Sequence, residues 1–119
     1  ILIQARPQGP SCHTGSVTCF NDQTPSNIGF LDHLGRLIAE RHKTMPNGSY
    51  TTSLFTEGKA RIAQKVGEEG VELALARMKD DSAEMANEAA DLLFHMMVLL
   101  EDAGLSLADA ISVLQDRHK

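Results

Sequence analysis

The chain has 119 residues, 42% of them hydrophobic, which is enough for one domain with a buried core. Its net charge of −5 and pI near 5.4 argue against nucleic-acid binding, because phosphate backbones are held by clustered Lys and Arg. Two cysteines make no disulfide framework, no apolar run has the length of a membrane span, and the start lacks a signal-peptide pattern. We therefore expect a cytoplasmic protein with no nucleic-acid or membrane partner. Since the first residue is Ile1, we expect a fragment or a processed chain.

The first 26 residues differ in composition from the rest of the chain. Residues 1–20 alternate short β-prone pieces with Pro and Gly, which is typical of strand and turn. The polar segment 21–26 that follows has the composition of a linker. The sequence therefore predicts a β/turn module over 1–20, a linker over 21–26 and a second module over 27–119.

The second module has the apolar periodicity of helices, with spacings of three and four residues. The expected helices are approximately 27–43, 51–79 with a bend near Gly58, 82–102 capped by Asp81 or Ser82, and a short last helix that opens at a Ser106–Asp109 capping box. Four helices joined by short loops predict an all-α four-helix bundle.

Acidic residues occupy apolar positions on two of these helices. Glu69 has Glu72 three residues on, and the next helix repeats the spacing with Glu88 and Asp91. Because the helices should be antiparallel and both 69/91 and 72/88 are centred on residue 80, the two pairs should face each other. A single Glu-x-x-Glu is more often solvated surface, but four facing carboxylates need a cation. Oxygen ligands favour Mg²⁺, then Mn²⁺, whereas a di-iron bundle would require Glu-x-x-His pairs.

Two stretches resemble a known enzyme family. They are SYTTSLFTEGKARIAQKVGEEGVELALA, from residue 49, and NEAADLLFHMMVLL, from residue 87. Over about residues 28–119 the chain resembles phosphoribosyl-ATP pyrophosphatase, an all-α pyrophosphohydrolase of the MazG-like type, whose signature is Glu-x-x-Glu followed by Glu-x-x-Asp. The resemblance implies a MazG-like bundle. It also implies Mg²⁺-dependent hydrolysis of phosphoribosyl-ATP to phosphoribosyl-AMP and pyrophosphate, the second step of histidine biosynthesis.

The resemblance, together with the negative charge of a phosphoanhydride, suggests roles for individual residues. The expected metal ligands are Glu69, Glu72, Glu88 and Asp91. The expected catalytic residues, among them a general base, are Glu68, Glu69 and Glu72. The expected substrate-binding residues are Lys65, Arg61, Ser49, Tyr50 and Thr51. Lys65 would neutralise phosphate oxygens, and Arg61 is the weaker candidate. For residues 49–51, turn and capping chemistry is an equally good interpretation.

Cys12 and Cys19 are separated by six residues, and as an isolated pair they are best interpreted as ordinary reduced thiols. The surrounding GPSCHTGSVTCF, however, resembles the C-terminal end of phosphoribosyl-AMP cyclohydrolase, where both cysteines bind Zn²⁺ together with a third cysteine. This implies the C-terminal part of a bifunctional enzyme, with residues 1–20 as the remnant of its cyclohydrolase domain. We expect Zn²⁺ only in the intact cyclohydrolase domain, and no cyclohydrolase activity in this chain.

Residues 92–100, LLFHMMVLL, are apolar at eight of nine positions and should be buried on all sides. Four short helices hardly surround such a segment, so we expect a homodimer. His95 within it is interpreted as a core histidine bonded to backbone or to Asp91 rather than as a metal ligand. Two alternative functions remain: a house-cleaning nucleoside triphosphate pyrophosphohydrolase, and a non-catalytic helical dimer stabilised by metal.

Overall fold

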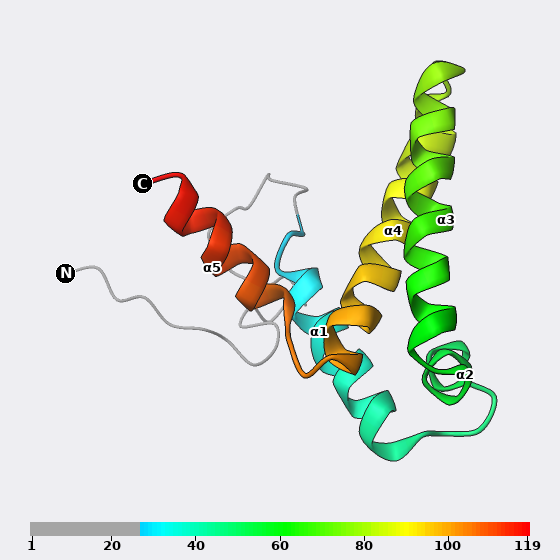
Figure 1. Cartoon of the computed structure of the whole chain (residues 1–119), viewed down its shortest axis with the longest axis vertical. Coiled ribbons are helices and arrows are strands. Elements are labelled where there is room, and N and C mark those ends of the chain that lie inside the picture. The colour runs from blue at the N-terminus through cyan, green and yellow to red at the C-terminus, as the bar shows by residue number, and fades with distance from the viewer. Residues whose placement is uncertain (1–26) are drawn as a thin grey trace, which may run out of the picture. The chain divides into compact units, whose positions relative to one another are not determined.

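The computed structural model describes residues 27–119, which contain helices and no strand (Figure 1). The helices are α1 (Phe30–Thr44), α2 (Tyr50–Glu57), α3 (Lys59–Met78), α4 (Ser82–Asp102) and α5 (Leu107–Arg117). The all-α prediction for this part of the chain is confirmed. The module expected over 1–20 and the linker expected over 21–26 lie outside the described residues.

The second predicted helix is two helices, because the chain breaks at Gly58 instead of bending there. Gly58 has φ 93° and ψ 179°, a backbone conformation that residues with a Cβ rarely adopt. Its N–H donates to the carbonyl oxygen of Leu54 at 3.1 Å and closes α2. Figure 1 shows α2 nearly end-on beside the start of α3, so the break turns the chain sharply. The described residues therefore form five helices where four were expected.

Helices α3 and α4 form the long antiparallel hairpin that the sequence predicts (Figure 1). Asp80 makes the turn with φ 54°, and the side chain of Asp81 caps α4 by accepting from the N–H of Glu84 at 3.0 Å. The predicted Ser106–Asp109 pair opens α5, where the backbone N–H of Ser106 donates to the Asp109 carboxylate at 2.8 Å. Both predicted caps are confirmed.

The core lies where α1, α2, the first half of α3 and the second half of α4 meet. Its buried members are Ile38, Leu54, Ile62, Met97 and Val98. Toward the turn of the hairpin three large apolar side chains of α3 are instead exposed: Val71, Leu75 and Met78 are 60%, 53% and 81% exposed. No helix in the described range has the length and apolar character needed to cross a membrane.

The apolar segment 92–100 is not fully enclosed by the described part of one chain, as expected for four short helices. His95, Met97 and Val98 are buried, but Leu93 is 39% exposed and the other members are partly buried. The reason is that the core helices cover only one side of this part of α4.

Candidate metal centre

Three acidic side chains converge on the inner face of the α3–α4 hairpin. Glu69 of α3 and Glu88 and Asp91 of α4 each present a carboxylate oxygen, and these three oxygens all lie within 4.8 Å of one another. The hairpin register explains the meeting, because residues at equal distances from the turn at Asp80 lie at the same height. Exposure increases across the group: Glu69 is 4% exposed, Glu88 is half-buried and Asp91 is exposed.

Glu72, the fourth expected ligand, lies at the rim of this cluster. Its carboxylate is near enough to Glu69 and Glu88 to affect the pKa of both, yet it adds no oxygen to the group that converges within 4.8 Å. Its side chain is exposed. The structure thus brings three of the four expected ligands together and leaves the fourth beside them.

The carboxyls of the cluster differ in their electrostatic environment. Burial, with the neighbouring carboxylates of Glu72 and Glu69, raises the pKa of Glu88 to about 7. A hydrogen bond from the Lys65 ammonium instead holds the pKa of Glu69 below its ordinary value. Oε2 of Glu88 is shielded from solvent and has no hydrogen-bond partner within the described part of the chain. A buried carboxylate oxygen without a donor is costly, and a cation would satisfy it.

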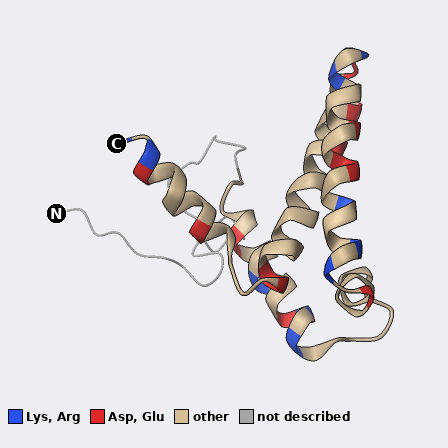
Figure 2. Cartoon of the chain, viewed as in Figure 1, with Lys and Arg blue, Asp and Glu red and all other residues tan. Residues whose placement is uncertain are grey.

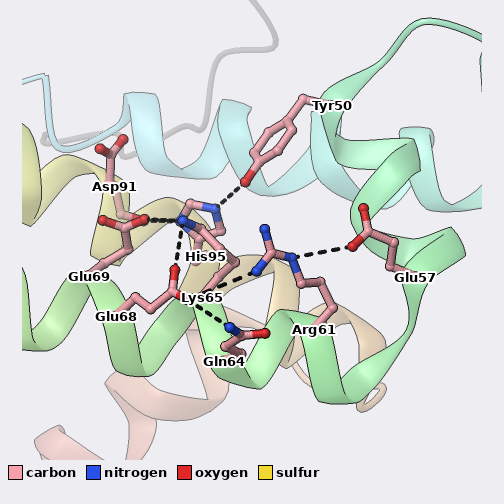
Figure 3. A network of polar contacts seen from close by, with 9 residues as sticks. All are labelled: Tyr50, Glu57, Arg61, Gln64, Lys65, Glu68, Glu69, Asp91 and His95. Atoms are coloured by element: carbon pink, nitrogen blue, oxygen red, sulfur yellow. Dashed lines mark hydrogen bonds and ion pairs between the residues drawn. The ribbon is translucent and has the colours of Figure 1, made fainter.

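Lys65 lies along one side of the cluster on α3 (Figure 3). Its Nζ is 2.8 Å from Oε1 of Glu69 and 3.2 Å from Oε2 of Glu68, so both carboxylates raise the pKa of this lysine. The spacing of three and four residues places these side chains on one helix face. Figure 2 shows basic residues along the first half of α3, acidic residues after them, and a basic residue again in the last turn, where Arg77 lies.

Glu68 and Arg61 lie beyond Lys65, and Glu68 is not among the converging acids. Glu68 accepts from Gln64 at 2.8 Å and from Lys65, and the Lys65 hydrogen bond lowers its pKa. Arg61 pairs with Glu57 at 3.3 Å and reaches Glu68 at 4.0 Å (Figure 3). Both therefore form the outer edge of the site.

Three of the expected substrate-binding residues lie at the start of α2, Ser49 as its N-cap and Tyr50 and Thr51 in its first turn, and not in a loop before it. Ser49 caps α2 by accepting from the N–H of Thr52 at 3.3 Å, and it also accepts from Arg41 at 3.2 Å. The capping chemistry considered from the sequence is therefore present at Ser49. Thr51 is buried at 8% exposure, whereas Tyr50 is 53% exposed.

His95 is the residue whose connections the sequence did not reveal. Its Nδ1 is 2.7 Å from the backbone carbonyl oxygen of Asp91, which confirms the prediction of a buried histidine bonded to backbone. Its Nε2, however, is 2.9 Å from the hydroxyl of Tyr50. No local pattern signals this contact, because it joins residues 45 positions apart.

The donor set fits a hard divalent cation. All ligand atoms are carboxylate oxygens, which Mg²⁺ and Mn²⁺ prefer. Oxygens bound to one Mg²⁺ at about 2.1 Å lie at most about 4.2 Å apart, so small side-chain rotations from the observed spacing would suffice. Burial of Glu69 and the unpartnered oxygen of Glu88 are the costs that such an ion would offset.

Comparison with known proteins identifies the family of this chain. The chain is 56% identical over 119 residues to a protein of Xanthomonas campestris pv. campestris, 53% identical over 120 to one of Xylella fastidiosa (strain Temecula1), and 49% identical over 121 to one of Vibrio cholerae serotype O1. Each is named histidine biosynthesis bifunctional protein HisIE. All of this chain is covered in each alignment, but only 56%, 56% and 58% of the respective relatives. The profile of the family phosphoribosyl-ATP pyrophosphohydrolase matches residues 31–118, which include the whole acidic cluster, and the chain therefore belongs to that family.

Proposed function

We propose that this chain hydrolyses phosphoribosyl-ATP to phosphoribosyl-AMP and pyrophosphate with Mg²⁺ as cofactor. The observation that carries the proposal is the convergence of Glu69, Glu88 and Asp91 within 4.8 Å, in a chain that belongs to this enzyme family. These three residues would hold the ion, and Glu72 at the rim would join them as an outer ligand or as the base. When bound, Mg²⁺ would supply the positive charge that lets a polyanionic substrate approach an acidic surface.

The residues around the ion would bind the substrate and orient the water. A carboxylate that is not fully used by the metal can accept the proton of the attacking water. The exposure of Glu72 favours it over Glu68, because Lys65 and Gln64 already occupy the carboxylate of Glu68. Lys65 would neutralise phosphate oxygens beside the ion, and Arg61 would contribute at longer range. Of the three residues expected to contact the ribose or phosphates, Ser49 is the accessible candidate for the phosphates, Tyr50 is the accessible candidate for the ribose, and Thr51 is the least accessible.

A separate proposal concerns the two cysteines of the N-terminal segment. Cys12 and Cys19, in the segment 1–20, would serve as Zn²⁺ ligands only within a complete cyclohydrolase domain. Those residues lie outside the described part of the structure. The full-length alignments with bifunctional relatives support the interpretation of this segment as the end of such a domain, since they extend over residues 1–26 as well. We expect the chain as given to have no cyclohydrolase activity, which incubation with phosphoribosyl-AMP would test.

We also propose that two copies associate as a homodimer. The exposed apolar side chains of Val71, Leu75 and Met78 share one face of α3, and Leu93 is exposed on α4. Burial of such a face against a second chain would remove several large side chains from water. Sedimentation equilibrium of the wild type and of Leu75→Glu would test this, since the charged variant should shift the distribution to monomer.

The catalytic proposal is tested by pyrophosphate release from phosphoribosyl-ATP, with and without Mg²⁺. Asp91→Asn and Glu72→Gln should each lower kcat/KM by at least about a hundredfold, as loss of a metal ligand or of a base does. Full Mg²⁺-dependent activity in Asp91→Asn would exclude the proposed ion site. A panel of nucleoside triphosphates assayed beside phosphoribosyl-ATP separates the proposed enzyme from a house-cleaning pyrophosphohydrolase.

A further inference from the structure

His95 joins the start of α2 to the acidic cluster. It is 4% exposed and lies one turn after Asp91 on α4. Figure 3 shows its ring between Tyr50 and Glu69. On one side Nε2 meets the Tyr50 hydroxyl at 2.9 Å, and on the other Nδ1 is 3.9 Å from Oε1 of Glu69. One imidazole ring therefore separates the tyrosine hydroxyl from a carboxylate of the proposed ion site.

The partners of His95 fix the direction of its hydrogen bonds. A backbone carbonyl oxygen only accepts, so the contact of 2.7 Å to Asp91 requires the hydrogen on Nδ1. In the neutral ring Nε2 then carries no hydrogen and accepts from the Tyr50 hydroxyl. The hydrogen of that hydroxyl is thereby committed to His95, while its oxygen can still accept a hydrogen bond.

Tyr50 is held at its tip and on one face, yet more than half of it is exposed. Its ring packs against Phe94, with centroids 6.1 Å apart and an interplanar angle of 26°, and meets the edge of His95 at 5.9 Å and 85°. The side chain is nevertheless 53% exposed. It also borders a shallow depression of about 630 Å³, whose other lining residues are Asn47, Gly48, Ser49, Thr52, Ser53, Thr56 and Glu57. An aromatic ring with restricted rotation and an open surface is a suitable platform for a planar base.

We propose that His95 is a positioning residue that fixes Tyr50 as the wall on which the nucleoside part of the substrate rests. The proposal depends on the proposed function, because it takes the phosphates of the same substrate to bind at Glu69, Glu88 and Asp91. A ring held by two packing partners and one hydrogen bond loses little freedom on binding, which favours affinity. His95 itself touches neither the ion nor the substrate in this arrangement and acts through Tyr50.

Two substitutions of His95 each keep one of its two hydrogen bonds and remove the other. In His95→Asn the amide approximates Nδ1 and can still donate to the Asp91 carbonyl, but Tyr50 loses its acceptor. In His95→Gln the longer amide approximates Nε2 and restores that acceptor. Tyr50→Phe removes the hydroxyl and keeps the ring, and Tyr50→Leu removes the ring.

The experiment measures steady-state kinetics with phosphoribosyl-ATP for the wild type and these variants. We expect KM to rise about five- to tenfold in His95→Asn and in Tyr50→Phe, with kcat within about twofold of wild type. The double variant should be no worse than either single one, because both remove the same bond. His95→Gln should restore most of the wild-type KM, and Tyr50→Leu should raise KM by more than tenfold.

Binding measurements distinguish this proposal from the proposed function. Calorimetric titration with pyrophosphate and Mg²⁺, which needs no aromatic wall, should give the wild-type dissociation constant in every folded variant. Titration with phosphoribosyl-AMP should weaken in parallel with KM. Long-range ¹⁵N–¹H correlation of the imidazole should report hydrogen on Nδ1 in the wild type and a shifted Nε2 signal in Tyr50→Phe.

The possible results lead to separate conclusions. A wild type that neither binds pyrophosphate with Mg²⁺ nor turns over phosphoribosyl-ATP would overturn the proposed function. An active wild type whose KM is unchanged in Tyr50→Phe and Tyr50→Leu would overturn the role of Tyr50 and His95 alone, and so would a fall in kcat without a change in KM. If the His95 variants do not fold, the two Tyr50 variants decide, because they alter a side chain that is mostly exposed.

Discussion

The half-buried carboxyl of Glu88 should make Mg²⁺ binding depend on pH. Burial and the neighbouring carboxylates raise its pKa to about 7. A group with that pKa is about nine-tenths protonated at pH 6 and about one-tenth protonated at pH 8. A proton on the ligand must leave before the ion binds, so the apparent dissociation constant for Mg²⁺ should be about tenfold higher at pH 6 than at pH 8.

In EDTA, where no metal is bound, the stability of the protein should fall as the pH rises, whereas the affinity for Mg²⁺ rises. The ordinary pKa of this carboxyl is 4.5, so the folded state holds the additional proton between that pH and about 7. The contribution of Glu88 to stability is fully present below pH 4.5 and is lost as the pH rises through about 7. Consequently the rise in Tm that saturating Mg²⁺ produces should be larger at pH 8 than at pH 6.

Glu88→Gln tests both statements, because the amide does not titrate and is a weaker ligand. Calorimetric titration with MgCl₂ should show affinity at pH 8 reduced by at least about tenfold and a smaller difference between the two pH values. Glu84→Gln is the matched control: it lies one turn earlier on α4, pairs with Lys79 at 3.5 Å and should behave as wild type. Equal wild-type affinities at pH 6 and pH 8, or an unchanged pH dependence in Glu88→Gln, would refute the reasoning.

Four further substitutions test the fold, each measured as the free energy of unfolding in urea. Gly58→Ala should destabilise the protein by about 1–3 kcal/mol, because alanine is strained at φ 93°. Gly67→Ala should instead stabilise it by about 0.5–1 kcal/mol, because Gly67 lies inside α3 and a Cβ there meets nothing within 4 Å. Asp81→Ala removes the side chain that caps α4 and should cost about 1 kcal/mol, with equal stability of the variant arguing against the cap. Ile62→Ala should cost about 2–5 kcal/mol, because this side chain is fully buried in the core, and a loss below about 1 kcal/mol would contradict that packing.

The acidic cluster could be predicted from the sequence because two independent regularities agree there. Glu69 occupies an apolar position of its helix, and it is buried. The matching distances of 69 and 91 from the turn at Asp80 then predict which residues meet across the hairpin, and those residues do converge. Helical periodicity and a short turn are local properties, so a single sequence contains them.

The break at Gly58 and the contact between Tyr50 and His95 are not encoded in that way. A glycine inside a helical pattern is compatible with a straight helix, a bend or a break, and the outcome depends on how α2 packs against the core. The hydrogen bond between residues 50 and 95 exists only after α2 has turned at Gly58. The exposure of Glu72 also depends on side-chain direction at the rim, which the three-residue spacing does not specify.

Lys65 on α3 cannot pair fully with the acidic residues and bind a substrate phosphate at the same time. Its ammonium lies 2.8 Å from Glu69 and 3.2 Å from Glu68, and each contact offsets the charge of one carboxylate. A divalent cation shared by Glu69, Glu88 and Asp91 would take over the compensation of Glu69. Lys65 would then need one partner fewer and could turn toward a phosphate oxygen. In this arrangement cation binding both neutralises the cluster and frees a basic side chain for the substrate, so the two binding events should strengthen each other.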